Sequence, residues 1–209
     1  MEVTVKERQG ADVDDQPPAS AAEALAIIER EQSRREPGIA PFFLIWGAAW
    51  TVIGLAWAGA DEGLGLWPGS AAGIATAAVI VVSAIASAVV GARLGRGVAG
   101  PSSEFGALYG WAWAIAMVGT GVLVGALARL GGPGVGVLAP ALFVFVVGAL
   151  YTLGGAFWRS RVDYGLGIAL QVIAVLSAFT PMPWNSLLMG LGGGGAMIVV
   201  GVLRWRSSR

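Results

Sequence analysis

The chain has 209 residues, of which 56% are hydrophobic and only 12% are charged, and its formal net charge at pH 7 is zero. Soluble domains usually carry about 25% charged residues, so this chain has too little charge to cover a water-facing surface. Cysteine and histidine are both absent, which excludes disulfides, thiolate nucleophiles, histidine pH switches and the usual zinc and haem sites. The balanced charge gives no reason to expect nucleic acid as a partner.

The N-terminal region divides into a tail and a helix. Residues 1–19 are polar, acidic and proline-containing, which is typical of a disordered cytoplasmic tail and unlike a cleavable signal peptide. Ser20 and Glu23 have the spacing of a capping box. The sequence after them predicts an amphipathic juxtamembrane helix over residues 20–36. This helix either rests on headgroups and cytoplasmic loops or acts as a gate or a docking site for a cytoplasmic protein.

Residues 41–203 are organised as membrane spans. A helix needs about 20 apolar residues to cross roughly 30 Å of hydrocarbon. We therefore predict an all-α, polytopic membrane protein with a cytoplasmic tail at residues 204–209. Its six predicted spans are residues 41–59, 70–92, 105–128, 140–158, 164–180 and 184–203. Pro140 suits the first position of the fourth span, where its missing N–H costs nothing.

The basic residues orient these spans, because Lys and Arg concentrate on the cytoplasmic side. Basic residues precede the first span and follow the second, fourth and sixth; those in the last three groups are Arg93, Arg96, Arg159, Arg161, Arg204, Arg206 and Arg209. Arg129 is the one exception. The pattern predicts that both termini are cytoplasmic. The Ala-, Gly- and Arg-rich composition indicates a bacterial protein, hence the plasma (inner) membrane.

The first and fourth spans share a pattern, G-A-x-[WY]-T-[VL]-x-G-x-x-W, at residues 47–57 and 148–158. The second and fifth spans are similar over fewer positions. Because the first and fourth spans cross in opposite directions, a three-plus-three repeat would be inverted, as in many transporters with a site between the halves. The alternative is that Gly- and Ala-rich helices match by chance.

Candidate site residues are neutral, because no charged residue lies at mid-depth in any predicted span. Thr51 and Thr152 are equivalent in the repeat, although such residues often bond only to their own helix. Gln171 is the only amide near the middle of a span, and its donors and acceptor need partners. The glycines of the sixth span either pack tightly against a neighbour or unwind toward a substrate.

Aromatic residues inside the spans and carboxylates at their starts are further candidates. Trp50, Trp113 and Tyr151 could line a site for an apolar or cationic ligand, or simply fill the interior of the bundle. Glu104 and Asp163 lie at the starts of spans, where carboxylates suit the helix dipole, so we assign them structural roles.

Two function classes follow. The leading hypothesis is a small transporter or channel for a neutral or lipophilic solute, with the binding residues Gln171, Thr51, Thr152, Trp50, Tyr151, Trp113, Gly192, Gly193, Gly194 and Gly195. The alternative is a non-transporting regulatory or assembly subunit that binds a protein partner, or a second copy, through residues 20–36 and the Arg-rich loops. An enzyme is not expected, since the spans offer no His, Cys or buried carboxylate as base or nucleophile. No cofactor or metal is implied.

Overall fold

The computed structural model describes residues 20–27, 36–96, 101–131 and 134–207 of the chain. Apart from turns, these ranges are helical, and they contain no strand. A 3₁₀ turn, η1 (Glu36–Ile39), precedes the bundle, and the helices that follow are α2 (Ala40–Ala58), α3 (Gly69–Leu94), α4 (Pro101–Leu130), α5 (Val135–Phe157), α6 (Arg161–Ala178), α7 (Trp184–Leu187), η2 (Leu188–Gly194) and α8 (Gly195–Ser207). Six helical segments are long and apolar enough to cross a membrane. The predicted all-α, six-span fold is confirmed.

The predicted start of the fourth span is wrong by five residues. The helix α5 begins at Val135, so Pro140 lies inside it. Proline has no N–H to donate to the carbonyl four residues earlier, which here belongs to Gly136. The glycines before Pro140 resemble a turn in the sequence, yet the chain after Gly134 is already helical.

The sixth span is one continuous helix whose middle is wider than an α-helix. Its central part, η2, has π-helical turns, in which each N–H bonds to the carbonyl five residues earlier. Gly192, Gly193 and Gly194 belong to these turns, and Gly195 begins α8. The glycine run is therefore helical throughout and is not an unwound break.

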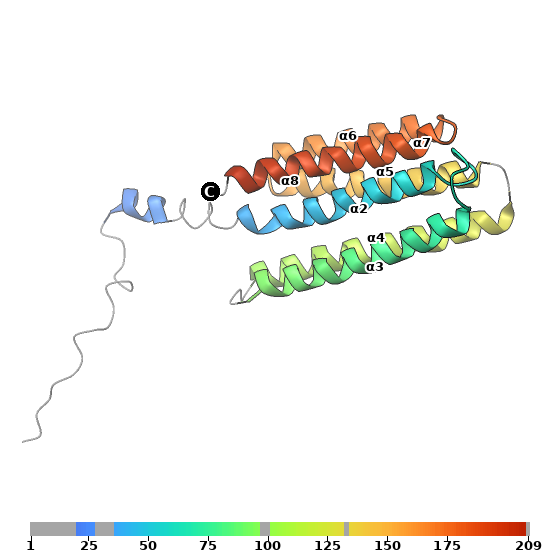
Figure 1. Ribbon diagram of the computed structural model, residues 1–209. Coiled ribbons are helices and arrows are strands. Elements are labelled where there is room, and N and C mark those ends of the chain that lie inside the picture. Colours follow the sequence, from blue (N-terminus) through green and yellow to red (C-terminus); the bar gives the residue numbers. More distant parts are fainter. Residues whose placement is uncertain (1–19, 28–35, 97–100, 132–133, 208–209) are drawn as a thin grey trace, which may run out of the picture.

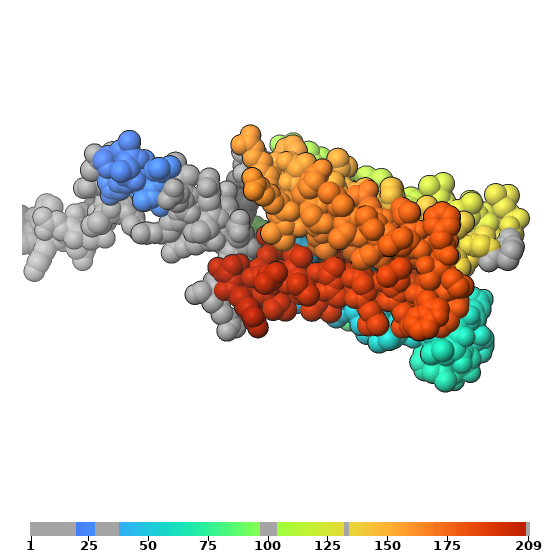
Figure 2. All heavy atoms as spheres, turned by 90° about the horizontal axis from the view of Figure 1, so that it is seen from above, coloured from blue at the N-terminus to red at the C-terminus, as the bar shows by residue number. Residues whose placement is uncertain are grey.

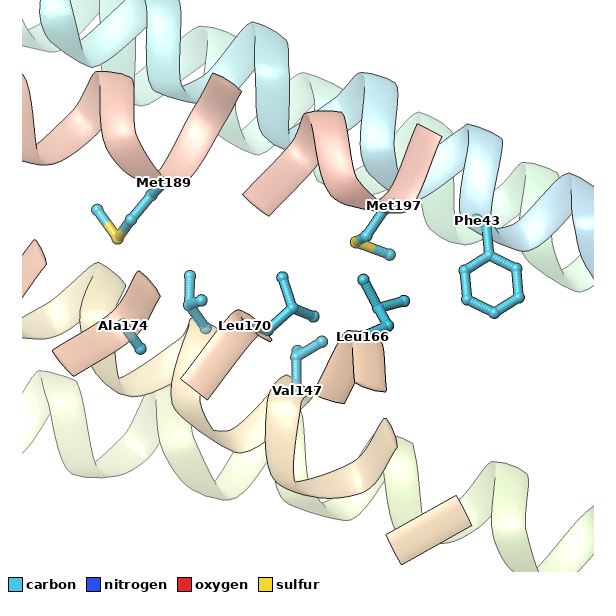
Figure 3. Packing of buried hydrophobic residues seen from close by; sticks show 8 residues of the cluster. Phe43, Val147, Leu166, Leu170, Ala174, Met189 and Met197 are labelled. Carbon is cyan, nitrogen blue, oxygen red and sulfur yellow. The ribbon is translucent and has the colours of Figure 1, made fainter. Parts of the chain in front are cut away.

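Successive spans run in opposite directions, and the helices fall into a core and a periphery (Figure 1). The most extensive packing joins α5 to α6 and α2 to the sixth span. The buried hydrophobic cluster lies among these four spans (Figure 3) and consists of Phe43, Val144, Val147, Leu166, Leu170, Ala174, Met189 and Met197. α3 packs mainly on α2, and α4 packs mainly on α5. Only 6% of the apolar window of α3, and the same share of α4, is buried inside the protein.

Side-chain hydrogen bonds tie α3 to α2. The indole of Trp46 donates to the Ser87 hydroxyl at 3.1 Å, and the indole of Trp57 donates to the Thr76 hydroxyl at 2.9 Å. The two tryptophans are eleven residues apart in α2, and so are the two hydroxyls in α3. They form two rungs, about three turns apart, between antiparallel helices.

The N-terminal helix is described only over residues 21–27. The Ser20 hydroxyl accepts a hydrogen bond from the Glu23 N–H at 3.2 Å, as the capping-box spacing predicts. Leu25 and Ile27 are exposed by 56% and 48%. Residues 28–35 of the predicted helix, and the predicted tail at 1–19, lie outside the described residues.

Candidate functional site

The amide of Gln171 lies at the contact between α5 and α6. Its Nε2 donates to the Thr152 hydroxyl at 2.8 Å and to the carbonyl oxygen of Gly167 at 3.3 Å. The Thr152 hydroxyl donates in turn to the carbonyl oxygen of Gly148 at 2.9 Å. Two predicted site residues are therefore in contact, and their donors are used in one bond between the helices and in two bonds within them.

The backbones of α5 and α6 approach closely beside this network. A Cβ atom added at Gly148 would lie 2.8 Å from the carbonyl oxygen of Gly167, and one added at Gly167 would lie 2.6 Å from that of Gly148. About two turns farther toward the end of α5, Gly155 lies against the backbone of Tyr164. Small residues permit this close approach, which is a common basis of helix association in membranes.

Thr51 makes the corresponding contact between α2 and the sixth span. Its hydroxyl lies 2.9 Å from the carbonyl oxygen of Gly47 in its own helix and 3.2 Å from that of Gly190 in η2. A Cβ atom added at Gly54 would lie 2.5 Å from the Gly190 Cα. Thr51 and Thr152 thus belong to different helix pairs and have different partners.

Two glycines of the run in the sixth span, Gly193 and Gly194, pack against α2. A Cβ atom at Gly194 would lie 2.7 Å from the carbonyl oxygen of Gly47, and one at Gly193 would lie 3.3 Å from the Trp50 ring. Gly192 is half-buried near Ile173, and a Cβ atom at Gly195 would meet no atom within 4 Å. The run therefore serves several neighbours and does not form a single surface toward one ligand.

These contacts bear on the predicted repeat. Gly47, Thr51 and Gly54 of α2 match Gly148, Thr152 and Gly155 of α5, and each triplet lines a close helix contact. The partners differ, since α2 uses the sixth span whereas α5 uses the fifth. In an inverted three-plus-three repeat the sixth span is equivalent to the third, which is α4. The contact of α2 with the sixth span would then correspond to a contact of this triplet of α5 with α4. The shared letters thus have a local packing explanation, and the inverted repeat stays a prediction.

Two of the three predicted aromatic residues meet. Tyr151 stacks on Phe43 with ring centroids 5.3 Å apart, and Trp113 meets Tyr151 edge-on at 5.1 Å. Trp50 packs separately against the core and Gly193. A cation already lies at this group, because the Arg204 guanidinium is 5.5 Å from the centroid of the Phe43 ring. This intramolecular cation–π contact is made to Phe43 and not to Trp50, Trp113 or Tyr151, so the predicted ligand contact at those three residues stays a prediction.

Arg204 also forms an ion pair that the sequence did not predict. Its Nη2 lies 2.8 Å from the Asp163 carboxylate and 3.0 Å from the Ser160 hydroxyl. The two charged side chains are 13% and 15% exposed. Ser160 caps α6 by accepting a hydrogen bond from the Asp163 N–H. Beyond the predicted role at the start of α6, Asp163 thus joins the start of α6 to the end of α8 through this ion pair.

A depression beside Gln171 is open to the outside of the bundle. It is lined by Ile168, Gln171, Val172, Val175 and Leu176. All these residues lie on α6, so the depression does not run between helices. A second amide, Asn185, is fully buried, and its Nδ2 donates to the carbonyl oxygen of Ser177 at 2.8 Å. Its position at the start of the sixth span, next to prolines, gave no signal in the sequence.

The apolar spans and their packing define a multi-pass α-helical membrane protein. No family model, no curated protein and no solved structure matches the chain.

Proposed function

We propose that the chain is a non-transporting membrane subunit, which binds a protein partner. One observation carries the proposal: the polar atoms and glycines that would form a solute site make helix–helix contacts instead. The Gln171 amide and the Thr152 hydroxyl bond to each other and to their own helices. A solute that used these donors would have to replace the bond between Gln171 and Thr152 and the bonds to their own helices.

Exposed apolar surface supports the same class. The helix α4 exposes Trp111 by 67% and Ile115 by 68%, although lipid alone is enough to cover such side chains. Leu25 and Ile27 of the N-terminal helix lie outside the predicted spans and are also exposed. In water or at the headgroups, burying those two side chains against a partner or in the membrane surface is energetically favourable.

Transport of a neutral solute is the second candidate. It is favoured by the π-helical turns of η2, since such turns are frequent at functional sites. The buried Asn185 Oδ1 atom has no hydrogen-bond partner among the described residues, which also favours this candidate.

Two measurements on the full chain separate these classes. Liposomes containing the protein should swell in glycerol or urea no faster than protein-free liposomes. A photo-crosslinker at Trp111 should yield a discrete protein adduct in native membranes, whereas one at Trp50, which faces the core, should not. Flux above the protein-free rate that Gln171→Leu reduces would contradict the proposal, and so would adducts with lipid alone.

A further inference from the structure

The turn between α5 and α6 contains an arginine in a backbone conformation that favours glycine. Arg159 has a φ of 55°. The Ser160 N–H bonds to the carbonyl oxygen of Gly155 at 2.8 Å, and the Arg159 N–H bonds to that of Ala156 at 3.3 Å. This pattern is a Schellman motif, whose left-handed position is usually glycine because a Cβ atom is strained there. Since arginine occupies this strained position in place of glycine, we look for a binding role of its side chain.

Two arginines of this turn have no anionic partner within the described part of the chain. Arg159 and Arg161 flank Ser160, and both are exposed. The nearest carboxylate along the chain, that of Asp163, is already paired with Arg204. Glu104 precedes Phe105, whose ring centroid lies 5.6 Å from that of Trp158, and among the described residues Glu104 forms no ion pair. The turn therefore has an excess of positive charge.

The turn also lies at the depth of the headgroups. It ends a membrane span, and Phe157 and Trp158 just before it are 66% and 49% exposed. Tryptophan in this position is typical of the membrane interface. Figure 2 shows α6 alongside the sixth span on one face of the bundle, with the start of α6 and the end of α8 at the same end. Lipid can therefore reach the turn from the side.

We propose that Arg159 and Arg161 bind the phosphate of an anionic phospholipid in the leaflet that faces this end of the bundle. Guanidinium groups suit phosphate because two N–H donors can bond two of its oxygens. Basic groups next to transmembrane helices are a recurring site for such headgroups. Phe157 and Trp158, which directly precede Arg159, offer exposed apolar ring surface to the upper part of an acyl chain.

The test uses native mass spectrometry of the full chain in detergent with added phosphatidylglycerol or phosphatidylcholine. Phosphatidylglycerol should bind more tightly to the wild type, and the preference should fall about fivefold for each arginine replaced by glutamine. The matched control is Arg93→Gln with Arg96→Gln, which removes the same charge from the end of α3 at the same end of the bundle. The control should keep the preference.

Arg159→Gly separates this role from a structural one. Glycine relieves the left-handed strain, so the unfolding temperature should stay the same or rise, while the preference for phosphatidylglycerol falls. Unchanged preference in Arg159→Gly, or an equal loss in the Arg93 and Arg96 control, would overturn the proposal. Displacement of the lipid by an equal concentration of inorganic phosphate would assign the turn to free anions and overturn it too.

Discussion

At the residue scale, glycines of this protein fall into two groups that the sequence does not distinguish. Gly54 touches the backbone of Gly190 across a helix contact, whereas a Cβ atom at Gly106 would meet no atom within 4 Å. Composition shows only that glycine is abundant. The position of a glycine relative to a neighbouring helix decides whether an added methyl group destabilises the fold.

Gly54→Ala should lower the free energy of unfolding by about 1–3 kcal/mol, because the new Cβ atom must displace the backbone of Gly190. Gly106→Ala should leave stability unchanged or raise it slightly, since alanine favours helix. Thermal unfolding of both variants in the same detergent provides the comparison. Equal effects would show that α2 and the sixth span do not approach as described.

The pair of Asp163 and Arg204 gives a second prediction at this scale. Arg204→Gln leaves a mostly buried carboxylate unpaired and should cost about 2 kcal/mol, less than a fully buried pair because both side chains retain some exposure. The double variant with Asp163→Asn should cost clearly less than the sum of the two single changes. Strict additivity in such a double-mutant cycle would mean that the two side chains do not interact.

At the element scale, helix pairs are joined in two ways. α5 and α6 meet through glycines and one amide network, while α3 is tied to α2 by tryptophan–hydroxyl bonds. Spans and their approximate bounds could be predicted from apolar length alone. The neighbours of each span could not, because lipid and protein present equally apolar surroundings to a helix.

This limit explains why the sequence identified candidate residues but not the contacts that they make with neighbouring helices. Gln171 and Thr152 are polar groups that need partners inside a span, but the sequence does not show that they bond each other. Asp163 and Arg204 each had a sufficient local explanation, one as a helix cap and the other as a cytoplasmic charge. Their pairing depends on α6 and α8 being neighbours, which no local pattern encodes.

The tryptophan–hydroxyl bonds predict a measurable coupling. Trp57→Phe and Thr76→Val should show an interaction energy of about 0.6 kcal/mol in a double-mutant cycle, a typical value for a hydrogen bond between membrane helices. Trp111→Phe on the exposed face of α4 should change little. The control is a double-mutant cycle of Trp111→Phe with Thr76→Val, two residues that do not bond each other. An interaction energy as small as in that control would mean that this bond does not hold α3 to α2.

At the scale of the whole molecule, four spans form a packed core and two spans lie at its edge with most of their surface uncovered. The arginines of the described ranges, except Arg129, lie at the end of the bundle that holds the start of α6 and the end of α8, in keeping with the predicted cytoplasmic orientation. Thr51, Thr152 and most of the other residues predicted as a solute site lie at contacts between the core helices, while Gln171 also borders the open depression on α6. The central claim is therefore that the core is sealed to water at mid-depth.

Cysteine accessibility tests this claim most directly, because the natural chain has no cysteine. Thr51→Cys and Thr152→Cys place a thiol at the two core contacts, and Ser70→Cys places one at the exposed start of α3. A water-soluble maleimide reacts with thiolate, which needs water to form. We predict that the folded protein is labelled at residue 70 and is labelled at 51 and 152 only after denaturation. Rapid labelling of either core thiol in the folded protein would contradict a sealed core and favour a solute pathway.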